Sequence, residues 1–400
     1  MAGQGILTFA SDALKLVYGD LHEQLRDKTP ALDFIQSSAA HLTQNGKEAR
    51  FDTHVGRNVG IGARDVRETL PSAGAQKYKQ ASLYLKNLYG AIEVDGQLFE
   101  QAADNYNAFI NVVDNEIKGL KKDLARDFNR QIYGDGTGTI ASVATAATAS
   151  TTVTMDSTTW ADVDMTVGFI RAGAFVSGTN VTISAINDTT KVITFSAAIT
   201  VQVGDKMVRY SNGTHSYNKE ITGLGAIVAA SGALHGIDPA TTPVWASTVT
   251  TLGTPPTPAT LTELNLINLV QKVDKQGGDV DVFLASPGVY NAYWNLLQGM
   301  RQFTNSSELT GGQRSFSFEA LGKPIKFISD YAAPSNTLYA LTSSEMVLNR
   351  KSDWAWMDRD GSMWNRVGET DAYQARLFQY VELGTYRRNA HAKLTNIAEL

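Results

Sequence analysis

The stretch Gly134-x-Gly136-x-Gly138 is the part of the sequence that looks most like a chemical motif, because spaced glycines can cradle a phosphate. Phosphate-binding loops, however, open a helix, where free N–H groups and the positive end of the helix dipole meet the anion. Here the glycines come after a long helical pattern and therefore close a helix. We interpret Gly134, Gly136 and Gly138 as helix-stop glycines, with Gly134 as a C-terminal cap in the left-handed conformation.

The other residues that could do chemistry do not combine into a site. Asp358-x-Asp360-Gly361 shares two aspartates with a calcium loop, but its glycine is at the wrong offset and the bidentate glutamate is missing, so it predicts a hairpin turn. The sequence has no Walker motif, no His-Glu-x-x-His and no Gly-x-Ser-x-Gly elbow. The histidines show no ligand spacing: His22, His41, His54, His215, His235 and His391. We therefore predict no enzyme, no metal and no cofactor.

Composition limits the function classes further. A chain of 400 residues, with 43% hydrophobic and 19% charged residues, is long enough for two or three domains with real cores. The absence of cysteine excludes disulfides, thiolate catalysis and Cys-ligated metals. A net charge of −5 argues against a protein whose main task is to bind nucleic acid. We expect neither an export signal nor a membrane span, and a mature protein that starts close to Met1.

A long amphipathic helix is predicted within residues 97–138. Its apolar residues recur every three or four positions, which places them in one stripe. A helix of roughly 35 residues spans about 50 Å, and few enzyme domains need such a rod. The stripe consists of Phe99, Ala102, Tyr106, Phe109, Val113, Ile117, Leu120, Leu124 and Phe128.

The segments before this helix predict an arm followed by an exposed loop. Residues 1–49 suggest an N-terminal arm, with a short helix near 13–25 and then turns from Pro30 to Asn45-Gly46. Residues 50–90 carry seven Lys or Arg and three Asp or Glu and predict a long two-stranded excursion. Because an isolated hairpin is only marginally stable in water, this excursion must contact another surface. A solvated loop, nucleic-acid contact and Lys–Asn isopeptide bonds stay open as alternatives. The candidates for inter-subunit contact are Arg57, Arg64, Arg67, Lys77 and Lys79.

The segment after the helix predicts an all-β domain. Residues 141–222 contain sixteen Thr and ten Val, with strand-like runs at 181–186 and 191–195 that a turn at 187–190 would join. The prolines at 243, 255, 256 and 258 then indicate a connector.

An α/β region is predicted beyond the connector. Thr260-Leu-Thr-Glu263 forms a capping box for a helix that Gly277-Gly278 ends. A buried strand at 280–284 leads through Ser286-Pro287 into a second helix, and later strands are expected at 325–328, 338–341, 354–357 and 377–383. The buried stripe of the first helix is expected at Leu261, Leu264, Ile267, Val270 and Val273.

In this order the elements resemble the major capsid proteins of tailed double-stranded-DNA bacteriophages, the Hong Kong 97-type fold, over nearly the whole chain. The similarity is in the arm, the basic loop, the long helix ending at Gly138, the segment Asp281-Val-Phe-Leu-Ala-Ser-Pro-Gly and the segment from Trp354 to Gly361. It implies an α+β chain with an inserted all-β domain. The implied divisions are 1–49 arm; 50–90 extended loop; 91–140 peripheral domain with the long helix; 141–222 β insertion; 223–258 connector; 259–340 central axial domain; and 341–400 second peripheral part with a return to the axial domain.

The same resemblance implies a function. The chain would self-assemble as hexamers and pentamers into an icosahedral virion shell, built in the host cytoplasm around double-stranded DNA held without sequence specificity. Implied partners are a separate scaffolding protein and a portal, with decoration proteins an open question. An encapsulin-type nanocompartment, a secreted β-rich adhesin and a hydrolase using scattered carboxylates remain as alternatives.

Overall fold

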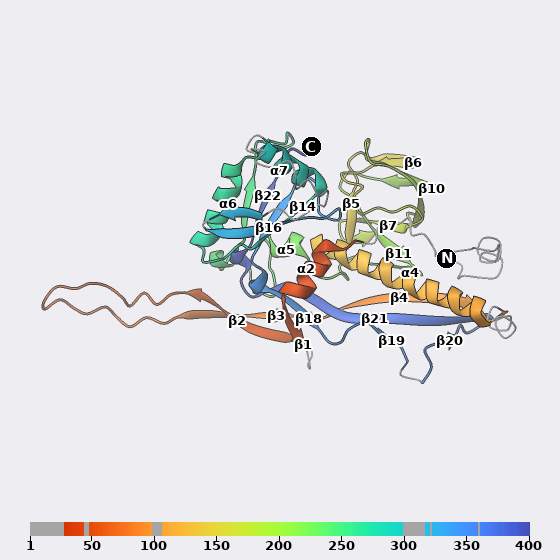
Figure 1. The fold of residues 1–400 in the computed structure, drawn as a ribbon, viewed down its shortest axis with the longest axis horizontal. Coiled ribbons are helices and arrows are strands. Elements are labelled where there is room, and N and C mark those ends of the chain that lie inside the picture. Colours follow the sequence, from red (N-terminus) through yellow and green to blue (C-terminus); the bar gives the residue numbers. More distant parts are fainter. Residues whose placement is uncertain (1–27, 44–47, 98–105, 299–316, 321, 359–360) are drawn as a thin grey trace, which may run out of the picture.

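The computed structural model describes residues 28–400 except 44–47, 98–105, 299–316, 321 and 359–360. The molecule is elongated, with a thin two-stranded finger at one end and a long helix lying on a flat sheet at the other (Figure 1). Two compact modules stand side by side above this base (Figure 1). None of the helices in these described ranges is long and apolar enough to cross a membrane.

The base is a six-stranded sheet built around one long strand, β21. The strand β4 pairs along one edge of β21, while β18, β19 and β20 follow one another along the opposite edge, and β1 runs parallel to β18. The bounds are β1 Ala40–Thr43, β4 Lys86–Asp95, β18 Met346–Arg350, β19 Ala355–Trp356, β20 Asn365–Arg366 and β21 Ala372–Thr385. The strand predicted at 377–383 is the centre of β21.

The long helix α4, Tyr106–Tyr133, lies along this sheet (Figure 1). It passes close to β4 at Gly90, where a Cβ atom would stand 2.7 Å from Leu124 and 2.8 Å from Leu120. At its C-terminal end the buried residues Phe128, Ile132 and Tyr133 enter the main hydrophobic core. The predicted helix is therefore confirmed from residue 106 onward. The predicted stripe is tested only from residue 116, where Phe128 is buried, and Phe99 and Ala102 lie outside the described residues.

The helix ends before Gly134, but the expected geometry of this glycine was wrong. Gly136 (φ 83°) and Gly138 (φ 75°) adopt the left-handed conformation, and Gly134 does not. The amide of Gly134 instead donates to the carbonyl of Gln131 at 3.0 Å, which tightens the last turn. The carbonyl of Gly134 accepts from Gly225 at 3.0 Å, so the stop is also a tertiary contact.

The two-stranded excursion predicted from the basic segment is present. The strands β2, Ala49–Gly56, and β3, Lys77–Leu83, pair antiparallel, and residues 57–76 extend beyond them (Figure 1). We call residues 49–83 the finger.

Upstream of the finger, the turns expected from Pro30 were wrong, because Pro30 opens the helix α2, Pro30–Ser38. Proline suits the first turn of a helix, since its φ is already helical and the backbone N–H that it lacks would have no partner within the helix there. The expected helix at 13–25 and the Asn45-Gly46 turn lie outside the described residues.

The Thr-rich segment forms an eight-stranded unit, residues 139–215, which we call the β module. Its strand order is β12-β11-β7-β9-β10-β6, with β5 on β11 and β8 on β7. The two predicted strands are confirmed as β9 and β10, and the amide of Thr190 closes their turn on the Asn187 side chain at 3.0 Å. The bounds are β5 Thr139–Ser142, β6 Ala147–Thr154, β7 Thr166–Arg171, β8 Ala174–Phe175, β9 Val181–Asn187, β10 Val192–Val201, β11 Lys206–Ser211 and β12 Thr214–His215.

The second module, which we call the α/β module, has a six-stranded sheet in the order β13-β22-β17-β14-β16-β15 with the helices α6 and α7. The stretch expected to be a connector contains the short helix α5, Leu224–Ile227, and the edge strand β13. The strand can form because the prolines lie on either side of Thr248–Thr251 and not within it. The bounds are β13 Thr248–Thr251, α6 Glu263–Lys275, β14 Val282–Ala285, α7 Pro287–Gln298, β15 Ser317–Ala320, β16 Lys323–Ser329, β17 Leu338–Leu341 and β22 Ala392–Thr395.

Two local expectations in this half of the chain need correction. The cap of α6 is Thr262, whose hydroxyl accepts from the amide of Asn265 at 3.3 Å, and not Thr260. Most of the predicted stripe is confirmed, since Leu261, Val270 and Val273 are buried and Ile267 is partly buried. Leu264 is 63% exposed, and Leu266 and Leu269 are buried in addition, because a strict spacing of three drifts around a helix of 3.6 residues per turn. Near the chain end, Gly361 does close a turn on Asp358 at 2.8 Å, but β19 and β20 pair with β21 and not with each other, so the predicted hairpin was wrong.

Candidate subunit interface

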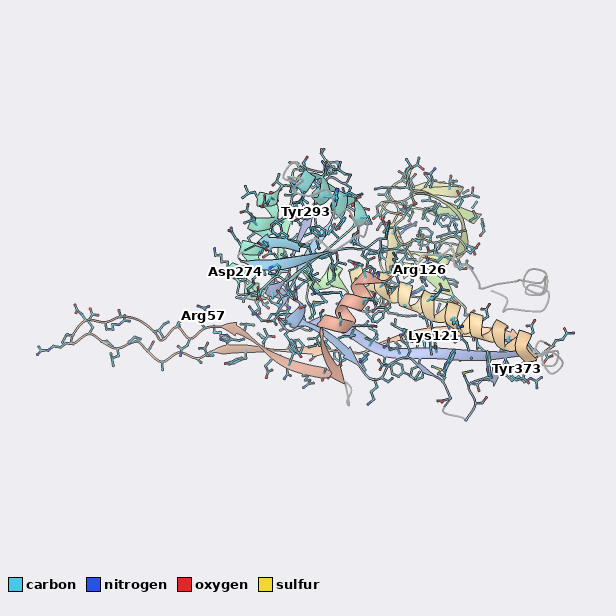
Figure 2. The ribbon with its side chains drawn as sticks, viewed as in Figure 1. Arg57, Lys121, Arg126, Asp274, Tyr293 and Tyr373 are labelled. Atoms are coloured by element: carbon cyan, nitrogen blue, oxygen red, sulfur yellow. The ribbon has the colours of Figure 1, made fainter. Side chains whose placement is uncertain are left out.

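The finger carries large apolar side chains that the other described residues do not cover. Val59, Ile61, Val66 and Leu70 are between 79% and 90% exposed, which is nearly the full exposure of an extended chain. The sequence-predicted contact residues Arg57, Arg64, Arg67, Lys77 and Lys79 are exposed as well and make no ion pair with any described residue. Figure 2 shows Arg57 at the point where the paired strands of the finger end. The combination indicates a surface that a partner covers.

The finger nevertheless has a defined shape, because Asn58 ties its two arms together. The Asn58 side-chain N–H donates to the carbonyl of Gly74 at 3.0 Å, and its oxygen accepts from the amide of Gly60 at 2.7 Å. Glycine is needed on both arms: a Cβ at Gly74 would lie 2.2 Å from the Asn58 oxygen, and one at Gly60 would lie 2.5 Å from the carbonyl of Ser72. The apolar side chains are therefore presented in a fixed arrangement.

The base of the finger is anchored to the centre of the molecule. The Thr53 hydroxyl donates to the carbonyl of Tyr386 at 3.1 Å, and Phe51 packs edge-on against the Tyr386 ring at 5.1 Å. On the other strand Leu83 is fully buried above Gly384, where a Cβ atom would lie 2.4 Å from the leucine. The base of the finger is therefore fixed to the body of the subunit.

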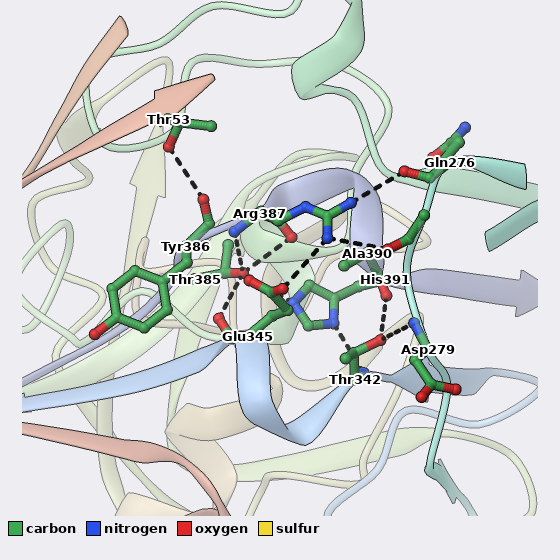
Figure 3. Close-up of polar contacts among 11 residues, drawn as sticks. Thr53, Gln276, Asp279, Thr342, Glu345, Thr385, Tyr386, Arg387, Ala390 and His391 are labelled. Atoms are coloured by element: carbon green, nitrogen blue, oxygen red, sulfur yellow. Dashed lines mark hydrogen bonds and ion pairs between the residues drawn. The ribbon is translucent and has the colours of Figure 1, made fainter. Parts of the chain in front are cut away.

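Tyr386 belongs to a junction, residues 385–391, that connects the finger, the base sheet and the α/β module (Figure 3). The guanidinium of Arg387 donates to the carbonyls of Gln276 and Gly277, each at 3.0 Å, and so places a positive charge at the negative end of α6. The hydroxyl of Thr385 donates to the carbonyl of Glu345 at 3.0 Å. The next residue, Arg388, is buried and donates to several main-chain carbonyls, including that of Ile227 at 3.0 Å.

His391 is a structural histidine of this junction. It is fully buried, with Nε2 2.9 Å from the Thr385 hydroxyl and Nδ1 accepting from the amide of Thr342 at 3.3 Å. Burial and then the charge of Arg387 lower the pKa of His391 to about 3, so the ring is neutral at ordinary pH. Both ring nitrogens are engaged in hydrogen bonds, which leaves neither free to bind a metal, and the described residues contain no group of three or more metal-ligating side chains.

A groove of about 1150 Å³ opens between the base of the finger and the α/β module. Finger residues 52–57 form one wall, and the turn Pro243–Trp245 and the end of α6 form the other. Val244 is 53% exposed in it. The groove is continuous with the finger and widens the surface that a partner can contact.

The remaining predicted residues lie in several parts of the fold. The helix-stop glycines lie where α4 leads into β5, the first strand of the β module. Of the other histidines, His54 bonds to Gln76 at 2.8 Å within the finger. His235 is half-buried, and burial followed by the charge of Arg388 lowers its pKa to about 4. The sequence analysis did not single out the apolar finger residues. Single valine, isoleucine and leucine residues among glycines and charged residues could have indicated an exposed apolar surface.

Comparison with known proteins addresses the fold. A scan against protein-family models gives no match, and a search of curated proteins gives none. Among solved structures, the cyanophage A-1(L) capsid asymmetric unit superposes with a TM-score of 0.63 at 15% identity, covering 98% of this chain and 99% of that chain. The fold is of the Hong Kong 97 capsid type.

This capsid-type fold recurs in the capsid of an empty gene transfer agent particle, with a TM-score of 0.50, 10% identity and coverage of 95% of this chain and 100% of that chain. The holo-SrpI encapsulin of Synechococcus elongatus gives a TM-score of 0.45 at 10% identity, with 100% and 97% coverage, which is too low to support an argument. The predicted α+β class and capsid fold are confirmed.

Proposed function

We propose that the chain is a major capsid protein, a structural subunit that assembles as hexamers and pentamers into an icosahedral shell around double-stranded phage DNA. The observation that carries this proposal is the finger: a capsid-type subunit presents a shaped projection whose large apolar side chains, Val59, Ile61, Val66 and Leu70, are exposed among the described residues. A catalytic role has no comparable support, since the buried titratable groups of the junction are occupied in structural bonds.

The partner of the finger is a second copy of the chain. The finger projects from one end of an elongated body, so a copy that covers it uses a different surface and leaves its own finger for a third copy (Figure 1). Such heterologous contacts generate rings when the rotation closes. Burying four large aliphatic side chains is worth roughly 1.5–3 kcal/mol each before the cost of association, so one contact can be modest and a shell of many contacts stable.

The basic side chains of the finger specify the partner surface. These side chains would face acidic or carbonyl-rich surface on the neighbouring subunit: Arg57, Arg64, Arg67, Lys77 and Lys79. Salt should weaken this attraction, because the Debye length at physiological ionic strength is only about 8 Å. We assign the α/β module, with 259–340 at its centre, to the capsomer axis and α4 with the base sheet to the periphery. A separate scaffolding protein, a portal and decoration proteins are the expected partners, and the virion is the expected location.

The test replaces apolar finger residues without touching the finger's base. Val66→Asp with Leu70→Asp should abolish shells and leave unassembled subunits with wild-type circular dichroism and melting. Ala73→Asp is the matched control, because it adds a carboxylate to the same exposed finger without removing a large apolar side chain. Shells of normal yield from the double variant would show that the finger is not the assembly contact.

A second experiment separates a genome container from a cargo compartment. Particles isolated from producing cells should contain nuclease-resistant DNA that is released only when the shell is opened. Shells that protect protein cargo and no DNA would favour the encapsulin-type alternative.

A further inference from the structure

The β module is joined to the body by a closed neck. Its entering and leaving segments run side by side: the amide of Asn218 donates to the carbonyl of Thr137 at 2.8 Å, and a Cβ at Gly138 would lie 2.8 Å from the carbonyl of Ser216. A neck of this kind fixes the point of attachment. By itself it would still allow the module to rotate.

A second set of contacts ties the module to the last turns of α4. Asp127 of α4 is 3.0 Å from the guanidinium of Arg209 on β11, and Arg126 forms an ion pair with Asp162 of the module. Asp127 also binds Arg130 at 2.9 Å, and Arg130 binds Glu220 at 2.6 Å. Burial alone would raise the pKa of Asp127, but the charges of Arg130 and Arg209 outweigh it and hold that pKa well below its usual range. The carboxylate is therefore charged whenever these contacts are intact.

A third contact reaches the α/β module. The indole N–H of Trp160 donates to the carbonyl of Ala332 at 2.8 Å, and the Trp160 ring packs against both the main core and the core of the β module. The neighbouring Asp330 accepts from Asn129 at 2.9 Å and from the Tyr133 hydroxyl at 3.2 Å. The loop 330–333 is thus held from two sides, by the β module and by the end of α4.

We propose that the β module is a clamp that holds the C-terminal end of α4 and the loop 330–333 of the α/β module in one arrangement, through Arg209 and Trp160. Attachment at the neck, at α4 and at Ala332 removes the rotation that a single neck would allow. Any change of shape in which α4 moves against the α/β module must then open one of these contacts or carry the β module with it. The module is a brace inside the subunit rather than an appendage for an external partner.

The test uses hydrogen exchange on unassembled full-length subunits, so it does not depend on shell formation. The variant combines Arg209→Gln with Trp160→Phe; Asp127 keeps Arg130 and Gln131 as partners, and the phenyl ring keeps most of the packing. The amides of residues 127–133 and 330–333 should exchange about tenfold faster than in the wild type, while those of β9 and β10 keep their rates. Lys191→Gln removes an exposed cation just before β10, whose ammonium donates to the carbonyl of Asp156 at 2.9 Å, and should leave the exchange of residues 127–133 and 330–333 unchanged.

Unchanged exchange at 127–133 and 330–333 would overturn the clamp. If β9 and β10 also exchange faster, the module has loosened as a whole, and Trp160→Phe alone decides: it should accelerate residues 330–333 without affecting β9, and an unchanged rate there would overturn the proposal. A failure of the capsid proposal would appear only in assembly assays and would leave these exchange rates as they are.

Discussion

Replacing Glu382 with glutamine should stabilise the subunit at alkaline pH and have little effect in acid. Glu382 is 3% exposed in β21, and its carboxylate accepts from the amide of Thr222 at 2.7 Å and from that of Leu383 at 3.1 Å. Burial raises the pKa of Glu382 from 4.5 to about 7, against the lowering effect of the Thr222 bond and the charge of Lys86. The side chain is therefore favoured in its protonated form.

The sign of the pH dependence follows from this raised pKa. The stability that Glu382 contributes is fully present below pH 4.5 and is lost as the pH rises through 7, because the folded state must then bury a charge that the unfolded chain leaves in water. The shift corresponds to about 3 kcal/mol at high pH, of which about 2.5 kcal/mol develops between pH 5 and pH 8. Glutamine keeps an oxygen that can accept from both amides and does not titrate.

The assay is urea denaturation of unassembled wild-type and Glu382→Gln subunits between pH 5 and pH 8. The difference in unfolding free energy between the two proteins should rise by about 2.5 kcal/mol over this range in favour of the variant. The lowered pKa values of His235 and His391 affect both proteins equally and cancel in the difference. Glu369→Gln, at an exposed position just before β21, controls for the chemical change. A difference that stays flat or falls with pH would refute the reasoning, because Glu382 would then be stabilised as a carboxylate.

Three further changes test single contacts. Asn58→Ala should separate the two arms of the finger and make tryptic cleavage after Arg64 about tenfold faster, whereas the control Asn87→Ala on β4 should leave the rate unchanged. Equal cleavage rates in the two variants would mean that Asn58 does not hold the arms together. Asp330→Ala leaves the donors of Ala31, Asn129 and Tyr133 without their acceptor and should cost about 3 kcal/mol or more in urea denaturation. Gly90→Val should lower the melting temperature, with a loss of about 1–3 kcal/mol, because its side chain meets the leucines of α4; an unchanged melting curve would contradict the close packing there.

The parts of the fold that sequence could predict are those with a strong local signal. The helix α4 has a long apolar period, the β module has a dense run of threonine and valine, and the finger has glycines and charges without period. Strands such as β17, Leu338–Leu341, were found because a short apolar run between turn residues is typical of a buried strand.

The parts that were missed depend on residues far apart in the sequence. The strand β1, Ala40–Thr43, pairs in parallel with β18, Met346–Arg350, and a four-residue segment gives no local sign of such a partner. The same holds for β13, which pairs with β22. At α6 the stripe was predicted with a strict spacing of three, which drifts around a helix of 3.6 residues per turn and so misplaced Leu264, while Val270 and Val273 were correctly predicted to be buried.

The exposure of the finger was predicted from sequence, whereas its role as a contact between subunits stays a prediction. Charge and glycine content placed an exposed loop and its basic residues correctly, but the anchoring of its base could not be read from sequence, since Thr53 and Tyr386 are joined only by the fold. The junction itself uses single arginine and histidine side chains bonded to main-chain carbonyls and hydroxyls, a pattern without any sequence spacing.

Electron microscopy of the expressed chain, alone and together with its candidate scaffolding protein, tests the central claim most directly. The account predicts closed icosahedral shells of uniform diameter, lost when Val66 and Leu70 of the finger are both replaced by aspartate and retained with Ala73→Asp. Uniform monomers under every condition, or assemblies that persist unchanged in the finger variant, would contradict it.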